Sequence, residues 1–438
     1  MGEAADRGDI EHLLRRSGFG ARTADVDALV GLDWEQAVDA VLDLSGAPDP
    51  AAGLPTVARA PAATTDWSGD YVPMVHHWLD RCATTATPIV EKMTLFWHGH
   101  LTSSASGVRL GPILDQHVLF QRSGLGRYDE LVDAVAIDPA MLIYLDGKSS
   151  HRWSPNENFA RELMELFCLG VGNYTEDDVR AAARAFTGYR VREGDDGDQS
   201  YYFLPTHHDE GDKTFMGVTK NWDGPAIIDH ILNGPTRMIA ARHLARRLWS
   251  FFAYPDPSDA IVDSLAATFD AADLELLPLV RAIFLHPEFR SDQCRNGLLR
   301  SPIELAVAAG IHTGLPASQI HAEWYLPDMG QRPFMPPNVD GWPQNEGYVA
   351  TSTFWARSRF ADRVGQVGAD AGLLAGSESR TVDDAVMTAL TTMGVTAPSQ
   401  ATRVTLASFV SQTRADEKWL ERRGLLTMSL LSPEFALA

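Results

Sequence analysis

Apolar residues recur every three to four positions along most of the chain, and this spacing predicts amphipathic helices. Such runs cover residues 8–20, 34–44, 71–83, 88–98, 112–122, 126–137, 156–168, 225–252, 258–284 and 301–314, with further helices after a Pro- and Gly-rich loop at 329–348. Pro88 suits a first helical turn, Gly170 suits a helix end, and Thr175 with Asp178 forms a predicted capping box. The pattern predicts a mainly α-helical protein.

Two segments depart from the helical pattern. Residues 191–224 combine Gly and Asp with the short aromatic run YYFLP, which predicts a small β-hairpin insert. Residues 48–66 are rich in Ala, Pro and Thr and predict a surface linker. We therefore expect a single large helical assembly, with one domain at 1–375 that holds the insert and a helical C-terminal subdomain at 376–438 packed on it.

The chain is strongly acidic, with 37 Lys and Arg against 58 Asp and Glu and a formal net charge of -21. Such a charge repels phosphate backbones, so nucleic acid is not an expected partner. A local basic patch at Arg242, Arg246 and Arg247 falls on neighbouring helical turns, where pairing with carboxylates is the expected role.

No stretch approaches the ~18 unbroken apolar residues of a membrane span, so no membrane association is expected. The N-terminus has no apolar segment of the kind that a secretory signal needs, which favours a cytoplasmic location, or export if a signal has been removed. The cysteines Cys82, Cys168 and Cys294 are few and far apart, which argues against a disulfide framework. Cys168 is expected to be a buried, inert thiol.

His98 and His100, separated by Gly99, are the first candidates for chemistry. Histidine is a frequent metal ligand and shuttles protons near neutral pH. The two rings can aim at one point if the backbone there is extended. Helix capping and core packing are the alternatives.

A polar stripe on the predicted helix 156–168 is the second candidate. Wound at about 100° per residue, Asn158, Arg161, Glu162 and Glu165 fall on one face. Two carboxylates three positions apart can share a metal ion or a proton. The alternative is an exposed face with salt bridges, since Arg161 and Glu165 are four apart.

Two loops supply the remaining candidates. The segment THHDEGDK places His208, Asp209 and Lys213 together, so a ligand and its orienting partner could come from one loop, and a solvated acidic turn is the alternative. The segment PPNVDGW contains Asn338 and Trp342, which we expect to fix the loop and to form a pocket wall. The motifs of serine hydrolases, P-loop nucleotidases, zinc proteases and dinucleotide-binding proteins are missing from the sequence.

Six segments together resemble one known family. They are HLLRRSGFG at 12–20, EKMTLFWHGHL at 91–101, DPAMLIYLDG at 138–147, NENFARELMELFCLGVGNYTEDDVRAAARAFTGY at 156–189, HHDEGDKTFMG at 207–217 and PPNVDGWP at 336–343. In this order they resemble the bacterial "domain of unknown function 1800" family. The resemblance implies a largely helical protein with no agreed reaction. Many members are exported and encoded beside a second family that looks like sulfatases and alkaline phosphatases.

The resemblance also implies that the polar blocks matter. The family's Trp-His-x-His-Phe block corresponds to Trp97, His98 and His100, with Leu101 in the last place. Its His-Asp pair corresponds to His208 and Asp209. Since helices rarely need such polar residues merely to pack, the resemblance favours a functional cleft.

The leading hypothesis is an enzyme with a metal ion held by histidines, a hydrolase or an oxidoreductase. His98 or His100, together with His208, would be nitrogen ligands, and Glu162, Glu165, Arg161 and Asp209 would be the catalytic residues. Asn158, Lys213, Asn338 and Trp342 would bind the substrate, which is an unidentified small molecule, peptide or saccharide. Mixed nitrogen and oxygen ligands suit zinc, manganese or iron, and a haem held by one histidine is a variant.

The alternative hypothesis is a non-catalytic binding or assembly protein with a protein or polysaccharide partner. Its polar motifs would form buried networks that fix the packing of the helices. A metal-free acid/base pair of Glu162 and Glu165 is the third option, and it is disfavoured because carboxylates one turn apart cannot flank a bond from opposite sides.

Overall fold

The computed structural model describes residues 5–57, 67–194, 198–295, 297–416 and 420–437. The first half of the chain contains α1 (Arg7–Ser17), α2 (Thr23–Leu29), α3 (Trp34–Val41), α4 (Val72–Thr84), α5 (Pro88–His100), α6 (Leu110–Ser123), α7 (Tyr128–Ala136), α8 (Pro139–Tyr144), α9 (Asn158–Glu162) and α10 (Glu176–Ala185). π-Helical turns occupy Trp67–Tyr71 and Leu163–Cys168, and the second continues directly from α9.

The second half contains α11 (Gly224–Leu232), α12 (Arg237–Phe252), α13 (Asp259–Ala271), α14 (Leu276–Leu285), α15 (Asp292–Arg295), α16 (Pro302–Thr313), α17 (Ala317–Ile320), α18 (Ala322–Tyr325), α19 (Thr351–Asp370), α20 (Val382–Thr392), α21 (Gln400–Asp416), α22 (Glu421–Leu430) and α23 (Pro433–Ala436). Short 3-10 turns lie at Gly147–Ser149, Pro205–His207, Pro287–Arg290, Asn345–Tyr348 and Ser377–Ser379. The predicted mainly α-helical fold class is confirmed. Within the described ranges, no helix combines the length and apolar composition that a membrane crossing requires.

Local sequence explains most helix ends. Pro88 occupies the first turn of α5, and Thr175 and Asp178 form the predicted capping box of α10. Two predicted helices are each broken into a pair. The segment 225–252 divides into α11 and α12 around Asn233-Gly234-Pro235, and 258–284 divides where Asp273 and Leu274 adopt positive φ angles of 53° and 61°.

The predicted β insert consists of two antiparallel hairpins. β1 (Tyr189–Glu193) pairs with β2 (Gln199–Phe203), with Tyr189 opposite Phe203. β3 (Lys213–Phe215) pairs with β4 (Val218–Lys220) through a tight turn in which Met216 and Gly217 both have positive φ, as two-residue hairpin turns require. Residues 195–197 of the insert lie outside the described residues.

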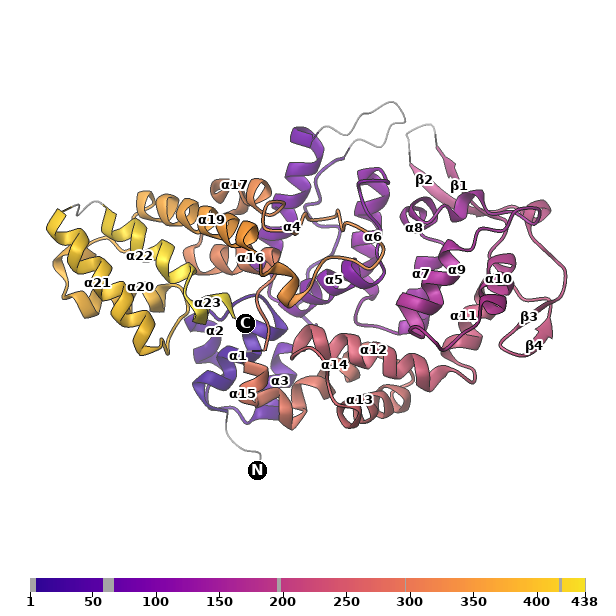
Figure 1. The fold of residues 1–438 in the computed structure, drawn as a ribbon, viewed down its shortest axis with the longest axis horizontal. Helices are drawn as coiled ribbons and strands as arrows, with labels where there is room; N and C mark the ends of the chain where they lie inside the picture. Colours follow the sequence, from indigo (N-terminus) through magenta and orange to yellow (C-terminus); the bar gives the residue numbers. More distant parts are fainter. Residues whose placement is uncertain (1–4, 58–66, 195–197, 296, 417–419, 438) are drawn as a thin grey trace.

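The helices enclose two hydrophobic cores. The first is built mainly from α1, α3, α7 and α10–α14, and the second from α4, α16 and α19–α22. Helix α5 contributes Met93 and Trp97 to the first core and Leu95 to the second. Figure 1 shows α5 near the middle of the molecule, between the orange and yellow C-terminal helices and the magenta helices that carry the hairpins. Because α5 is buried on every side, its charged residues are buried too.

The two hydrophobic cores bear on two predictions about domain organisation. The C-terminal helices α20–α22 share the second core with α4 and α16, and the division near residue 375 stays a prediction. The predicted linker 48–66 is more than a surface segment at its described end, because Val57 is buried in the second core. Residues 58–66 lie outside the described residues.

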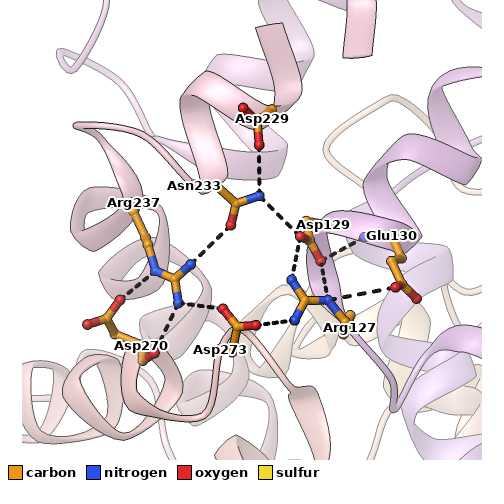
Figure 2. A network of polar contacts seen from close by, with 8 residues as sticks. All are labelled: Arg127, Asp129, Glu130, Asp229, Asn233, Arg237, Asp270 and Asp273. Atoms are coloured by element: carbon orange, nitrogen blue, oxygen red, sulfur yellow. Dashed lines mark hydrogen bonds and ion pairs between the residues drawn. The ribbon is translucent and has the colours of Figure 1, made fainter. Parts of the chain in front are cut away.

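A polar network links α7 to α11, α12 and α13 on the surface (Figure 2). Arg127 binds the carboxylates of Asp129 and Asp273, and Arg237 binds those of Asp270 and Asp273. Asn233 extends the network with a hydrogen bond to Asp129 of 3.2 Å. Asp273 is largely exposed, so solvent weakens its pairs with Arg127 and Arg237, whereas the Asp129 carboxylate is mostly buried.

Candidate functional site

His98 and His100 lie on opposite sides of α5. The helix continues through His100, so side chains two positions apart are rotated by roughly 200° and cannot aim at one point. His98 Nε2 lies 3.0 Å from Nδ1 of His117 on α6, and rings of Trp78 and Phe334 enclose the pair. Burial lowers the pKa of His98 to about 3, so this imidazole is neutral at pH 7.

His100 faces the π-helical turn that follows α9. Its Nε2 lies 3.1 Å from the carbonyl oxygen of Phe167, and its ring stacks on Phe96. A carbonyl can only accept, so Nε2 carries the proton and Nδ1 keeps a lone pair. That Nδ1 is buried and has no hydrogen-bond partner in the described part of the chain. Burial, followed by the charge of Arg247, holds the pKa of His100 well below its usual value.

The His208 loop lies against the end of α10. His208 Nδ1 bonds the carbonyl oxygen of Thr187 at 2.9 Å, and Arg184 binds both Asp209 oxygens at 2.7 and 3.1 Å. Hydrogen bonding to Arg184 lowers the pKa of Asp209, which is therefore ionised at neutral pH. Lys213 Nζ donates to Asn221 Oδ1 at 2.9 Å and to the backbone oxygen of Asp209. The polar groups of this loop are largely engaged with one another and with α10.

The three predicted metal ligands therefore have separate surroundings. His98 binds a histidine of α6, His100 a carbonyl of the π-helical turn, and His208 a carbonyl that follows α10. Among the residues that the structure describes, no three His, Cys, Asp or Glu side chains come together as a metal-binding group. His98 and His100 point apart because the backbone between them is helical. The sequence interpretation required an extended backbone there.

The polar stripe of α9 is mostly paired. Arg161 forms ion pairs with Glu157 and Glu176, Glu165 accepts a hydrogen bond from the Tyr174 hydroxyl at 2.7 Å, and Asn158 donates to the carbonyl oxygen of Leu145 at 3.3 Å. The predicted pair of Arg161 with Glu165 is not among the ion pairs of the described residues.

Glu162 is the exception in this stripe. It is half-buried, and it makes no hydrogen bond or ion pair within the described ranges. Burial raises the pKa of Glu162, and the nearby charges of Glu165 and Asp340 raise it further. Asp340 belongs to the loop 329–348, so this loop approaches the end of α9.

The loop 329–348 has both buried and exposed residues, with Asn338 and Gln344 among the exposed ones. Phe334 and Tyr348 are buried, and Trp342 donates from Nε1 to the carbonyl oxygen of Arg332 at 3.1 Å. Asn338 Oδ1 accepts from the backbone N–H of Asp340 at 3.0 Å, which holds the turn. Gly341 has a φ of 88°, and a Cβ atom there would lie 2.4 Å from the carbonyl oxygen of Gly99, so the loop rests directly on α5.

A cavity of about 230 Å³ lies where this loop meets α1, α5, α12 and α16. Its wall includes Arg16, Phe96, Gly99, Arg247, Ser250, Phe251, Glu304, Gln331, Trp342 and Tyr348. Of the predicted site residues, Trp342 belongs to this wall. The volume suits part or all of a small organic molecule.

An ion pair at the cavity wall joins α5 to α16, and its carboxylate, Glu304, lines the cavity. The Lys92 ammonium of α5 contacts the Glu304 carboxylate of α16, and Glu304 also accepts from the backbone N–H of Ser301 at 2.8 Å. Burial alone would raise the pKa of Glu304, but Lys92 and Ser301 lower it to about 2. Arg16 of α1 lies beside this pair, fully buried, and donates to the carbonyl oxygen of Cys294 at 2.5 Å.

Sequence reasoning did not select Arg16, Lys92, Arg247 or Glu304. Arg16 and Lys92 lie inside two of the segments that resemble the family, HLLRRSGFG and EKMTLFWHGHL. Their place in these segments was the sequence signal that could have identified them. Arg247 was expected to pair with a carboxylate. Its neighbours Arg242 and Arg246 do so with Asp259, whereas Arg247 forms no ion pair or hydrogen bond in the described residues.

The three cysteines are free and buried, as expected for Cys168, and burial raises the pKa of the Cys168 thiol to about 12.

No curated protein and no solved structure matches the chain. The model of one protein family, described as "Protein of unknown function (DUF1800)", matches residues 12–437. The match includes α1, α5, α9, the His208 loop and the loop 329–348. The chain therefore belongs to the DUF1800 family.

Proposed function

We propose that this chain is a binding protein for a small molecule, which occupies the cavity bounded by Arg16, Arg247, Glu304 and Trp342. The observation that carries the proposal is a cavity of about 230 Å³ whose wall holds the buried Arg16 and the partly buried Arg247 and Glu304. Charged side chains lose much hydration free energy when they are buried, and a bound ligand can replace the lost interactions. Aromatic walls with a few polar groups are typical of ligand pockets.

The polar family motifs have a structural role in this proposal. His98, His100 and His208 each bond a neighbouring segment inside the protein, and Arg161 and Asp209 are held in ion pairs. Buried hydrogen bonds and ion pairs of this kind fix how helices pack. The motifs would therefore hold the helices that enclose the cavity.

Blocking the cavity tests the proposal. Ser250→Phe adds a ring to the wall, and it is expected to abolish the rise in melting temperature that small organic ligands cause in the wild-type chain. A thermal-shift screen of charged and neutral metabolites measures this effect. Ser264→Phe on the exposed face of α13 is the matched control and should respond like the wild type. Equal responses of both variants to every ligand found would contradict the proposal.

A metal- or haem-dependent hydrolase or oxidoreductase is the second candidate function. The unpartnered Nδ1 lone pair of His100 favours it, because such a nitrogen can bind a metal ion or accept a proton. Glu162, unpaired and with a raised pKa, would be its general base. The substrate would be a small molecule, a peptide or a saccharide.

Two variants separate these functions. For the binding protein, His100→Ala should lower the free energy of unfolding by about 2–4 kcal/mol through the lost packing and hydrogen bond. Glu162→Gln should change it by no more than about 0.5 kcal/mol. Urea denaturation measures both. Near-stoichiometric metal or a haem absorption band that disappears in His100→Ala, with the fold intact, would instead establish the enzyme.

A further inference from the structure

Buried positive charge exceeds negative charge in the cluster around Glu304, which lies on the cavity wall. Lys92, Arg16, Arg300 and Arg357 are at most 4% exposed. Glu304 is the carboxylate whose charge acts on all four of them. Burial lowers the pKa of Arg16 to about 10 and that of Arg300 to about 9, so both remain charged at pH 7. One carboxylate cannot balance four cations.

Several donors in this cluster also lack acceptors. Nε of Arg16, Nη1 of Arg300, and both Nε and Nη1 of Arg357 are buried without hydrogen-bond partners among the described residues. The same holds for the hydroxyl of Tyr348, which lies on the cavity wall. Buried N–H and O–H groups are nearly always paired in proteins. Of these residues Arg16 and Tyr348 line the cavity, so their unpaired donors point to a missing acceptor there.

Arg247 of α12 adds a further cation to the cavity wall. It is half-buried and makes no ion pair or hydrogen bond within the described ranges. Asp340 is the carboxylate whose charge acts on it. The other wall carboxylates, Asp256 and Glu346, are exposed to solvent, which screens their charge. Arginine is well suited to bind carboxylate or phosphate oxygens.

Aromatic rings form another part of the wall. Phe96, Phe251 and Trp342 offer ring surfaces next to the charged groups. We infer that the ligand is a small organic oxyanion, with an apolar body against these rings and a carboxylate or phosphate group that accepts hydrogen bonds from Arg247, Arg16 and Tyr348. This inference rests on the proposed binding function and names its ligand class.

The test uses the full chain and three probes of similar size, namely benzoate, phenyl phosphate and the neutral benzamide. Isothermal titration should give binding of at least one anion, with benzamide at least tenfold weaker. Tighter binding of benzoate identifies a carboxylate ligand, and tighter binding of phenyl phosphate identifies a phosphate ligand. The affinity for the anion should fall as the salt concentration rises.

Matched variants locate the binding. Arg247→Met keeps the approximate length of the side chain. It should lower the affinity for the anion at least tenfold and leave the affinity for benzamide unchanged. Arg246→Met, on the same helix and paired with Asp259, should bind like the wild type. Tyr348→Phe should weaken the anion and raise the melting temperature of the ligand-free chain, because it removes an unpaired buried hydroxyl.

The outcomes separate this inference from the proposed function. The oxyanion inference would be overturned if benzamide bound as tightly as the anions and Arg247→Met did not change their affinity. The proposed binding function would stand in that case if Ser250→Phe still abolished ligand binding. Failure of all three probes to bind the wild type would also overturn the oxyanion inference. If Ser250→Phe then changes no ligand response in the screen, the proposed function is wrong as well.

Discussion

Replacing Glu304 by glutamine is expected to lower the free energy of unfolding by about 3–5 kcal/mol at pH 7. The change leaves Lys92 and the buried arginines without their shared counter-charge. Glutamine keeps the size of the side chain and can still accept the Ser301 N–H, so the cap of α16 survives. Urea denaturation followed by tryptophan fluorescence measures the loss.

The asymmetry of the Lys92–Glu304 pair provides the sharper test. Lys92→Met should lower the free energy of unfolding by less than Glu304→Gln does. The reason is that Glu304 is still attracted by Arg16, Arg300 and Arg357 when Lys92 is replaced. Glu35→Gln removes a carboxylate from an exposed pair with Arg281 and should cost about 1 kcal/mol or less. A larger cost for Lys92→Met than for Glu304→Gln would contradict the excess of buried positive charge.

The pH dependence of this contribution follows from the pKa of Glu304. Its pKa is lowered in the folded state from 4.5 to about 2. The carboxylate therefore stabilises the fold fully above pH 4.5, and the contribution is lost as the pH falls toward 2. Any loss of stability between pH 6.5 and 5 must come from other groups.

Acidification from pH 7 to about 5 is expected to remove most of the stability of the protein. Burial strongly lowers the pKa of five histidines, to about 3 for His98 and His312 and well below 6.5 for His12, His100 and His117. Below pH 6.5 the unfolded chain binds protons that the folded chain excludes, so stability falls as the pH falls. Each histidine contributes up to about 1.4 kcal/mol per pH unit, and five together rival a total stability of about 5–15 kcal/mol.

Two carboxyl groups with strongly raised pKa values oppose this trend. Burial raises the pKa of Asp138 to about 7 and that of Asp133 to about 6, so each stabilises the fold more as the pH falls toward 4. Asp138 caps α8 and accepts a hydrogen bond from Gln116, which limits the desolvation of its charged form. Two opposing groups reduce the slope of stability against pH but do not reverse the effect of five histidines.

The slope of the unfolding free energy between pH 6.5 and 4.5 checks this expectation. His117→Gln removes one titrating group, and the slope should fall by about one proton. Phe120→Leu is the matched control, since it disturbs the same cluster without titrating and should lower stability equally at each pH. A flat dependence of wild-type stability over this range would contradict the neutral buried histidines.

Local sequence signals anticipated most of the helices because they act over a few residues. The capping box at Thr175, the proline at the start of α5 and the positive φ of Gly170 after the π-helical turn all agree with the sequence interpretation. The same local reasoning missed the breaks in 225–252 and 258–284. At Asp273 and Leu274, two residues other than glycine adopt left-handed backbone angles, which no local preference predicts.

The candidate site was harder to predict because burial and pairing depend on segments far apart in the chain. Lys92 and Glu304 are separated by 212 residues, and Arg16 and Cys294 by 278. Periodicity identifies the face of a helix that points inward when the other face is exposed. Helix α5 is buried on all sides, so its pattern does not distinguish Lys92 from a solvated lysine.

The sequence by itself determined the mainly helical class, many of the helix ends and the family, since each rests on local spacing or on segments that match in order. Only the tertiary structure decided the partners of the polar residues. It turned His98 and His100 to opposite sides of one helix, paired Arg161 with Glu176, and left Arg247 without a described partner. The physical reason is that the environment of a charge, and with it the chemistry available, depends on which distant segments surround it.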